Sequence, residues 1–214
     1  MRDLRSEFRT RYAVNAILMF AVTTLIAVSF SIGSYGIKET EKPFLNAVLL
    51  WIILVFSALS GLSRSFVKEE EAGTMDILKL SARPQAVFLG KLFFNLTLLV
   101  ALEIIIVPAF VVIMGYHIRL PFFFGTMVIS AGLGLGAGTT IVAAMIAQAG
   151  ARGALFSALS FPLLLPLMIT AIKGCERAAI GHDPAGWPEV RIAVAYVIIM
   201  IVTSLFLFPL IWEE

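Results

Sequence analysis

The stretch LFFNLTLLVALEIIIVPAFVVIMGYHI (Leu92–Ile118) holds a single charged residue, Glu103, among 27 residues. An α-helix needs about 20 predominantly apolar residues to cross the hydrocarbon core of a bilayer. The run is continuously apolar, whereas the strands of a membrane β-barrel alternate between apolar and polar residues. This stretch therefore predicts a membrane-spanning helix.

Five further runs of 20 residues or more carry no charge at all. They are Tyr12–Ile37, Pro43–Ser63, Leu120–Ala151, Gly153–Ile172 and Ile192–Trp212. We therefore expect an all-α integral membrane protein with six transmembrane helices in a single domain, residues 1–214. The predicted spans are residues 13–36, 44–64, 89–115, 121–147, 153–173 and 191–212.

The composition excludes several classes of protein. Hydrophobic residues make up 60% of the 214 residues and charged residues 14%, with a mean hydropathy of +0.98. An average soluble domain has about 25% charged residues, so a soluble enzyme is excluded. The net charge of +2 gives no basic footprint for nucleic acid. One cysteine and two histidines form no zinc-type cluster, and we expect neither a catalytic residue nor a tightly held cofactor or metal.

The chain contains no Walker A, GxSxG or HExxH pattern. If transport is driven by ATP, the hydrolysis must therefore take place on another chain. The two histidines, His117 and His182, fall in predicted outer loops. Either could serve as an axial ligand to heme iron, but a lone loop histidine is more often a solvated side chain.

The distribution of Lys and Arg predicts the orientation in the membrane. The N-terminal residues, the segment Arg64–Lys91 and Arg152 together hold ten Lys and Arg residues, whereas the loops on the other side hold six. Basic residues gather on the cytoplasmic side of membrane proteins. We therefore expect a multi-pass protein of the bacterial inner membrane with both termini in the cytoplasm.

The first twelve residues, MRDLRSEFRTRY, place Met1, Leu4, Phe8 and Tyr12 at intervals of three and four residues. This spacing predicts a short amphipathic helix lying in the membrane interface. The alternative is a charged flank that only sets the topology.

The segment Arg64–Lys91 is the only sizeable part of the chain expected on the cytoplasmic side. It opens with the cluster Lys68-Glu69-Glu70-Glu71, after which Gly73 breaks the run and Thr74 can cap a short helix over Met75–Leu80. Pro84 is expected to end that helix. Its apolar face can dock on a partner protein or rest on lipid, and the residues alone favour neither.

Three features lie within the predicted spans. Glu103 is either a polar lining or proton or substrate site, or a neutral packing group, because an ionisable side chain at membrane depth faces protein or water. Gly132, Gly134, Gly136 and Gly138 form two pairs with the spacing of close helix packing. Pro108, Pro162 and Pro166 are expected to distort their helices.

The stretches FVKEEEAGTMDILKLSARPQAVFLGKLFFN (Phe66–Asn95) and ARGALFSALSFPLLLPLMI (Ala151–Ile169) resemble the heme exporter protein B family. This resemblance implies the membrane subunit of an ABC-type complex for cytochrome c maturation, with the fold of an ABC-2 permease. It implies four partners: a cytoplasmic ATPase, a heme-handling membrane protein, a small single-span helper and, indirectly, a periplasmic heme chaperone. Heme would be the substrate, and ATP would bind to the partner.

The resemblance also assigns roles to the two cytoplasmic segments. The N-terminal helix would be the elbow helix of ABC-2 exporters, and the segment after the second span would couple this chain to the ATPase. The coupling residues implied are Glu69, Glu70, Glu71, Gly73, Thr74, Met75, Ile77 and Leu78.

Three other functions remain open at this point. An ABC-2 permease could export another hydrophobic substrate, such as a lipid or a drug. A membrane scaffold would have no ATPase partner. A secondary transporter could move protons through Glu103, although a single acid without a partner is thin support for it.

Overall fold

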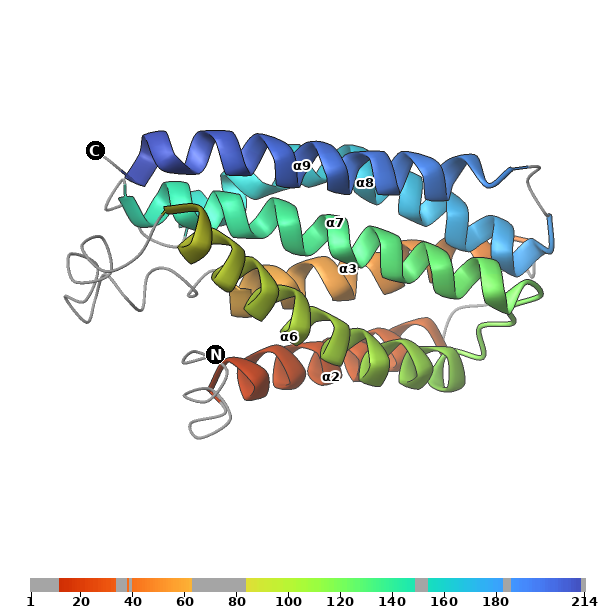
Figure 1. Ribbon diagram of the computed structural model, residues 1–214. Coiled ribbons are helices and arrows are strands. Elements are labelled where there is room, and N and C mark those ends of the chain that lie inside the picture. The colour runs from red at the N-terminus through yellow and green to blue at the C-terminus, as the bar shows by residue number, and fades with distance from the viewer. Residues whose placement is uncertain are drawn as a thin grey trace.

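The computed structural model describes residues 12–33, 38, 40–62, 84–148, 154–182 and 186–212. The regular elements of these residues are all α-helices, which confirms the predicted all-α fold (Figure 1). The predicted elbow helix, apart from Tyr12, and the coupling residues from Glu69 to Leu78 lie outside the described residues. The helices are α2 (Tyr12–Gly33), α3 (Lys42–Leu62), α6 (Pro84–Ile113), α7 (Pro121–Gln148), α8 (Ala154–Ile180) and α9 (Pro188–Trp212).

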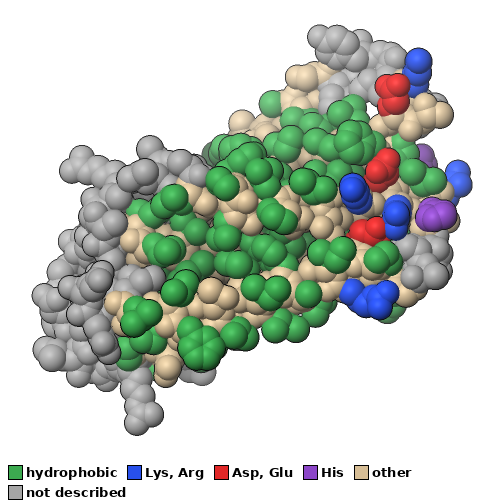
Figure 2. Space-filling view, turned by 90° about the horizontal axis from the view of Figure 1, so that it is seen from above, with side chains coloured by type: hydrophobic (Ala, Val, Ile, Leu, Met, Phe, Trp, Pro, Cys, Tyr) green, Lys and Arg blue, Asp and Glu red, His purple; other side chains and the backbone are tan. Residues whose placement is uncertain are grey.

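Five of these helices are long and apolar enough to cross a membrane, by length and composition. The helix α2 contributes a shorter apolar stretch, Ile17–Ser31. Side chains such as Phe93, Val112 and Phe206 are large, apolar and exposed on the outside of the bundle. Figure 2 shows this apolar surface, with the charged side chains that are visible on this face gathered at one end of it. A bundle with an apolar outer wall and charges at its end suits a bilayer.

The helix α7 lies at the centre of the bundle and contacts α3, α6, α8 and α9 (Figure 1). It is rich in Gly and Ala, and small residues let helix backbones approach closely in a membrane, where no hydrophobic force drives helices together. The helix α2 packs on α3 and α6 at the edge. The core of the protein is therefore formed by α7 and the helices that pack around it.

Several helix ends differ from the sequence-based expectation. The helix α8 runs to Ile180, seven residues beyond the predicted end at 173, and α9 begins at Pro188 rather than at 191. The extra turns follow Lys173 and carry Glu176 and Arg177. These polar residues hid the helix from a search for charge-free runs, but helix ends at the membrane surface accommodate charges readily.

The start of α6 also differs. Pro84 is the first residue of α6, and the short helix that it is predicted to end, Met75–Leu80, lies outside the described residues. Proline suits the first position of a helix because its missing N–H would have no intrahelical partner there. The helix α6 therefore starts five residues before the predicted span at 89.

Candidate functional site

A row of buried polar side chains crosses the apolar helix α6 and faces the bundle. Lys91, Asn95 and Glu103 stand at intervals of four and eight residues, which places them on one side of the helix. All three are buried, and Glu103 is only 5% exposed. We call these residues, together with Gly132 and Thr140 of α7, the polar seam.

Two contacts within the polar seam join α6 to α7. The Nδ2 atom of Asn95 donates a hydrogen bond of 2.9 Å to Oγ1 of Thr140. The carboxyl group of Glu103 lies on Gly132, where a Cβ atom would be 2.6 Å from Cδ of Glu103. A step of eight residues along α6 thus matches a step of eight residues back along α7, so the antiparallel helices keep one register over about 12 Å.

The Oε1 atom of Glu103 is buried and accepts no hydrogen bond from the residues that the structure describes. Insertion scales assign about 2.5–3.5 kcal/mol to an acidic side chain at the centre of a membrane helix. Glu103 limits this cost by facing α7 instead of lipid. The geometry leaves room for the two roles predicted from the sequence, a packing group or a proton or substrate site.

The four glycines of α7 are divided between two sides of the helix. Gly132 and Gly136 face α6, where added Cβ atoms would meet Glu103 and Leu96. Gly134 and Gly138 face α8 and α9, and their nearest neighbours are Leu167, Leu164 and Tyr196. The two pairs that the spacing indicated therefore correspond to two different helix interfaces of α7.

The three prolines lie inside continuous helices. Pro108 is in α6, and Pro162 and Pro166 are in α8. The hydroxyl of Tyr196 on α9 donates a hydrogen bond of 3.0 Å to the carbonyl oxygen of Leu163, between the last two prolines. The prolines thus do not end their helices, and the predicted distortion stays a prediction.

Sequence reasoning missed most of the polar seam. The charge distribution predicts only that Lys91 lies on the cytoplasmic side, and the structure adds that it is buried in the bundle. Asn95 and Thr140 were passed over because neither is charged. The intervals between Lys91, Asn95 and Glu103 could have indicated a shared helix face, but only the structure shows which residues of α7 stand opposite.

These observations define a class of protein, a multi-pass α-helical membrane protein whose polar groups meet between helices in its interior. Within this class, the family model described as CcmB protein matches residues 1–210. The chain belongs to this family, the heme exporter protein B family, as the two sequence stretches indicated.

The family is the membrane permease component of a heme-export ABC system in cytochrome c biogenesis. The chain is accordingly a multi-pass permease subunit of the inner membrane, in a complex that also uses an ATPase. Among curated proteins, no sequence match to this chain was found.

Proposed function

We propose that this chain couples ATP hydrolysis on a separate cytoplasmic ATPase to the transfer of heme, or to the release of a heme-loaded chaperone. The residues from Glu69 to Leu78 dock on the ATPase. Heme is the substrate, and ATP is bound by the partner. The chain works as a dimer, or as a pseudo-dimer with a related subunit, over two ATPase subunits.

The connectivity of the bundle carries this proposal. The segment 63–83, which holds the coupling residues, joins the end of α3 to the start of α6. Between them, these two helices contact every other helix of the described residues, namely α2, α7, α8 and α9. A movement of the ATPase that shifts this segment would therefore reach the whole bundle through two helices.

The polar seam gives that movement a defined route to the centre. The helix α6 follows the coupling segment directly, and it holds α7 through Asn95–Thr140 and Glu103–Gly132. The hydrogen bond between Asn95 and Thr140 favours one register, because a sliding helix would leave it unsatisfied in an apolar environment. A displacement of α6 along its axis would thus carry α7 with it.

The remaining partners are part of the same proposal. A heme-handling membrane protein, a small single-span helper and a periplasmic heme chaperone complete the pathway, and the chain needs both termini in the cytoplasm to meet the ATPase. The excess of Lys and Arg around the segment Arg64–Lys91 supports that orientation.

The test reverses three charges at the start of the coupling segment. Glu69→Lys, Glu70→Lys and Glu71→Lys are combined in a strain that lacks the chromosomal gene. Heme staining of membrane c-type cytochromes measures maturation, and co-purification of the ATPase measures docking. We expect both to fall at least about tenfold, because like charges placed in an interface cost several kcal/mol, while the amount of the chain in the membrane stays unchanged.

The matched control reverses two acids of the same type at the C-terminus, Glu213→Lys and Glu214→Lys, which follow the end of α9. This control should keep both maturation and co-purification. If the triple variant retains both activities, the assignment of the coupling segment is wrong.

A further inference from the structure

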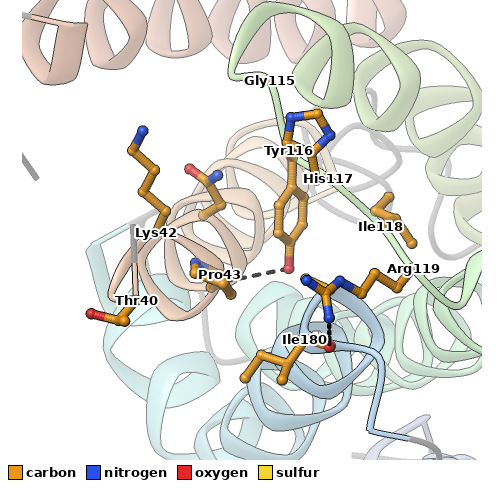
Figure 3. A pocket seen from close by; sticks show the side chains of 11 residues that line it. Thr40, Lys42, Pro43, Gly115, Tyr116, His117, Ile118, Arg119 and Ile180 are labelled. Atoms are coloured by element: carbon orange, nitrogen blue, oxygen red, sulfur yellow. Dashed lines mark hydrogen bonds between the residues drawn. The ribbon is translucent and has the colours of Figure 1, made fainter. Parts of the chain in front are cut away.

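A pocket of about 770 Å³ opens at the end of the bundle where α3 begins and α8 ends (Figure 3). It lies between the start of α3, the link from α6 to α7, and the end of α8. No part of the coupling proposal uses it. Its lining residues that bear on the argument are Lys42, Asn46, Tyr116, His117, Arg119 and Ile180.

The charge of this pocket favours an anion. Lys42 and Arg119 are cationic, and the described lining residues include no acid. The pocket also sits at the N-terminus of α3, which begins at Lys42, and the N-terminal end of a helix carries partial positive charge. In Figure 3 the side chains of Lys42, His117 and Arg119 stand around the pocket.

Arg119 is held in place by the end of α8. The backbone N–H groups of Arg119 and Leu120 both donate to the carbonyl oxygen of Ala178, at 3.1 and 3.0 Å. One guanidinium N–H of Arg119 donates to the carbonyl oxygen of Ile180 at 3.1 Å. A guanidinium has five N–H donors, so Arg119 can bind a ligand while it keeps this contact.

The floor of the pocket is cross-linked by hydrogen bonds and partly polar. The hydroxyl of Tyr116 donates to the carbonyl oxygen of Cys175 at 2.9 Å and lies 3.4 Å from that of Pro43. It thereby ties the link between α6 and α7 to both α8 and α3. Asn46, which is buried beside it, adds an amide group to the floor.

Aromatic side chains place the pocket at the membrane surface. Phe44 and Phe122, each in the first turn of its helix at this end, are 51% and 74% exposed. The ring of Trp187 packs on Phe122 with centroids 5.6 Å apart. Tryptophan gathers at the level of lipid head groups, so a ligand of this pocket can come directly from the bilayer.

We propose that the pocket binds the anionic head group of a phospholipid. The phosphate would be held by Lys42 and Arg119, and the glycerol region would lie against apolar walls formed by Pro43, Ile118 and Ile180. The volume is far larger than one inorganic anion needs, and the apolar walls suit an amphiphile. This site is separate from the coupling segment, so each proposal can fail without the other.

The experiment measures lipid retention by the full-length chain. The protein is purified in detergent with equal amounts of phosphatidylglycerol and phosphatidylcholine, and native mass spectrometry counts the lipids retained per chain. We expect selective retention of one phosphatidylglycerol. The variant Lys42→Gln with Arg119→Gln should weaken it about tenfold or more, since hydrogen bonds to charged groups are the stronger ones. Arg119→Lys should retain more lipid than Arg119→Gln.

Matched cations at the same end of the bundle provide the control. Lys173 and Arg191 are exposed and do not line the pocket, so Lys173→Gln with Arg191→Gln should retain the lipid. Equal loss in both double variants, or equal retention of the two lipids by the wild type, overturns the proposal. If inorganic phosphate displaces the lipid as well as short-chain phosphatidylglycerol does, the ligand is a soluble anion and the lipid assignment is wrong. Lys42→Gln alone, at an exposed position, serves if the variants of Arg119 do not fold.

Discussion

Glu103 of α6 rests its carboxyl group directly on Gly132 of α7, so that a Cβ atom at position 132 would lie 2.6 Å from Cδ and 2.8 Å from Oε2 of Glu103. Real Cβ atoms do not approach other atoms so closely. The glycine is therefore a condition for the position of the acid, and the acid fills the space that the glycine leaves. The missing side chain of Gly132 thus makes room for the carboxyl group of Glu103 in an apolar interface.

We predict that Gly132→Ala destabilises the bundle by about 1 kcal/mol, the low end of the usual cost of an added methyl group in a packed interior, because the atoms that it meets are the end of a flexible side chain that can turn aside. The added Cβ must push the carboxyl group of Glu103 out of the α6–α7 interface. The measurement is the thermal unfolding of the purified chain in detergent.

Gly125→Ala is the matched control on the same helix, because nothing lies within 4 Å of a Cβ added there. It should leave stability unchanged or raise it, since Ala favours a helix by about 1 kcal/mol over Gly. In Glu103→Ala, the cost of Gly132→Ala should largely disappear. A full cost in that background would show that the contact with Glu103 is not its cause.

The second prediction concerns Tyr116, which joins α8 and α3 at the far end of the bundle. Tyr116→Phe removes the hydroxyl that donates to Cys175 and should cost about 1–2 kcal/mol of stability at neutral pH. The measurement is again thermal unfolding. If the stability falls by less than a few tenths of a kcal/mol, the hydroxyl does not stabilise the contact of Tyr116 with α3 and α8.

The same tyrosine should produce a pH dependence. Burial raises the pKa of the Tyr116 hydroxyl above its ordinary value near 10. Below pH 10 the tyrosine is protonated in the folded and unfolded states, and its contribution to stability is fully present. Above about pH 10 the unfolded state loses the proton first, so stability falls as the pH rises. Tyr116→Phe should show a shallower fall in an unfolding series from pH 8 to about pH 11, and an identical slope would refute this origin.

The third prediction tests the orientation with cysteine labelling. The single cysteine of the chain, Cys175, is fully buried, and Nε1 of Trp51 donates a hydrogen bond of 3.3 Å to its sulfur. The wild type should therefore react with a membrane-impermeant maleimide only after denaturation. The labelling of introduced cysteines can then be measured without removing Cys175.

In intact spheroplasts, Lys38→Cys should be labelled and Glu70→Cys should not, because the charge distribution predicts that position 70 lies in the cytoplasm. In inverted vesicles the pattern should reverse. Labelling of Glu70→Cys from outside would overturn both the orientation and the coupling proposal.

The sequence predicted the order of the six helices that the structure describes because apolar length is a local property. Charge-free runs locate a span without knowledge of its neighbours, as Leu92–Ile118 did for α6. The same rule misplaced the end of α8, where Lys173, Glu176 and Arg177 continue the helix. A helix can continue through charged residues at the membrane surface. A prediction that ends each helix at the first charge therefore makes it too short.

Partners across helix interfaces could not be predicted in this way. The spacing of Gly132, Gly134, Gly136 and Gly138 indicated two packing faces, but which helix each face meets depends on the rotation of α7. The seam between Asn95 and Thr140 and the pocket around Arg119 likewise join residues far apart in the chain. These arrangements follow from the register and order of packed helices, which local periodicity does not contain.

The last prediction separates the two roles of Glu103. Glu103→Gln keeps the size of the side chain and replaces the acid by a neutral amide. If Glu103 is a packing group of the seam, the variant should unfold within about 1 kcal/mol of the wild type or at higher stability, since no buried charge has to be accommodated. Heme staining should then show at least half of the wild-type level of c-type cytochromes. If the variant folds normally but staining is lost, the acid itself takes part in moving a proton or the substrate, and the packing role is refuted.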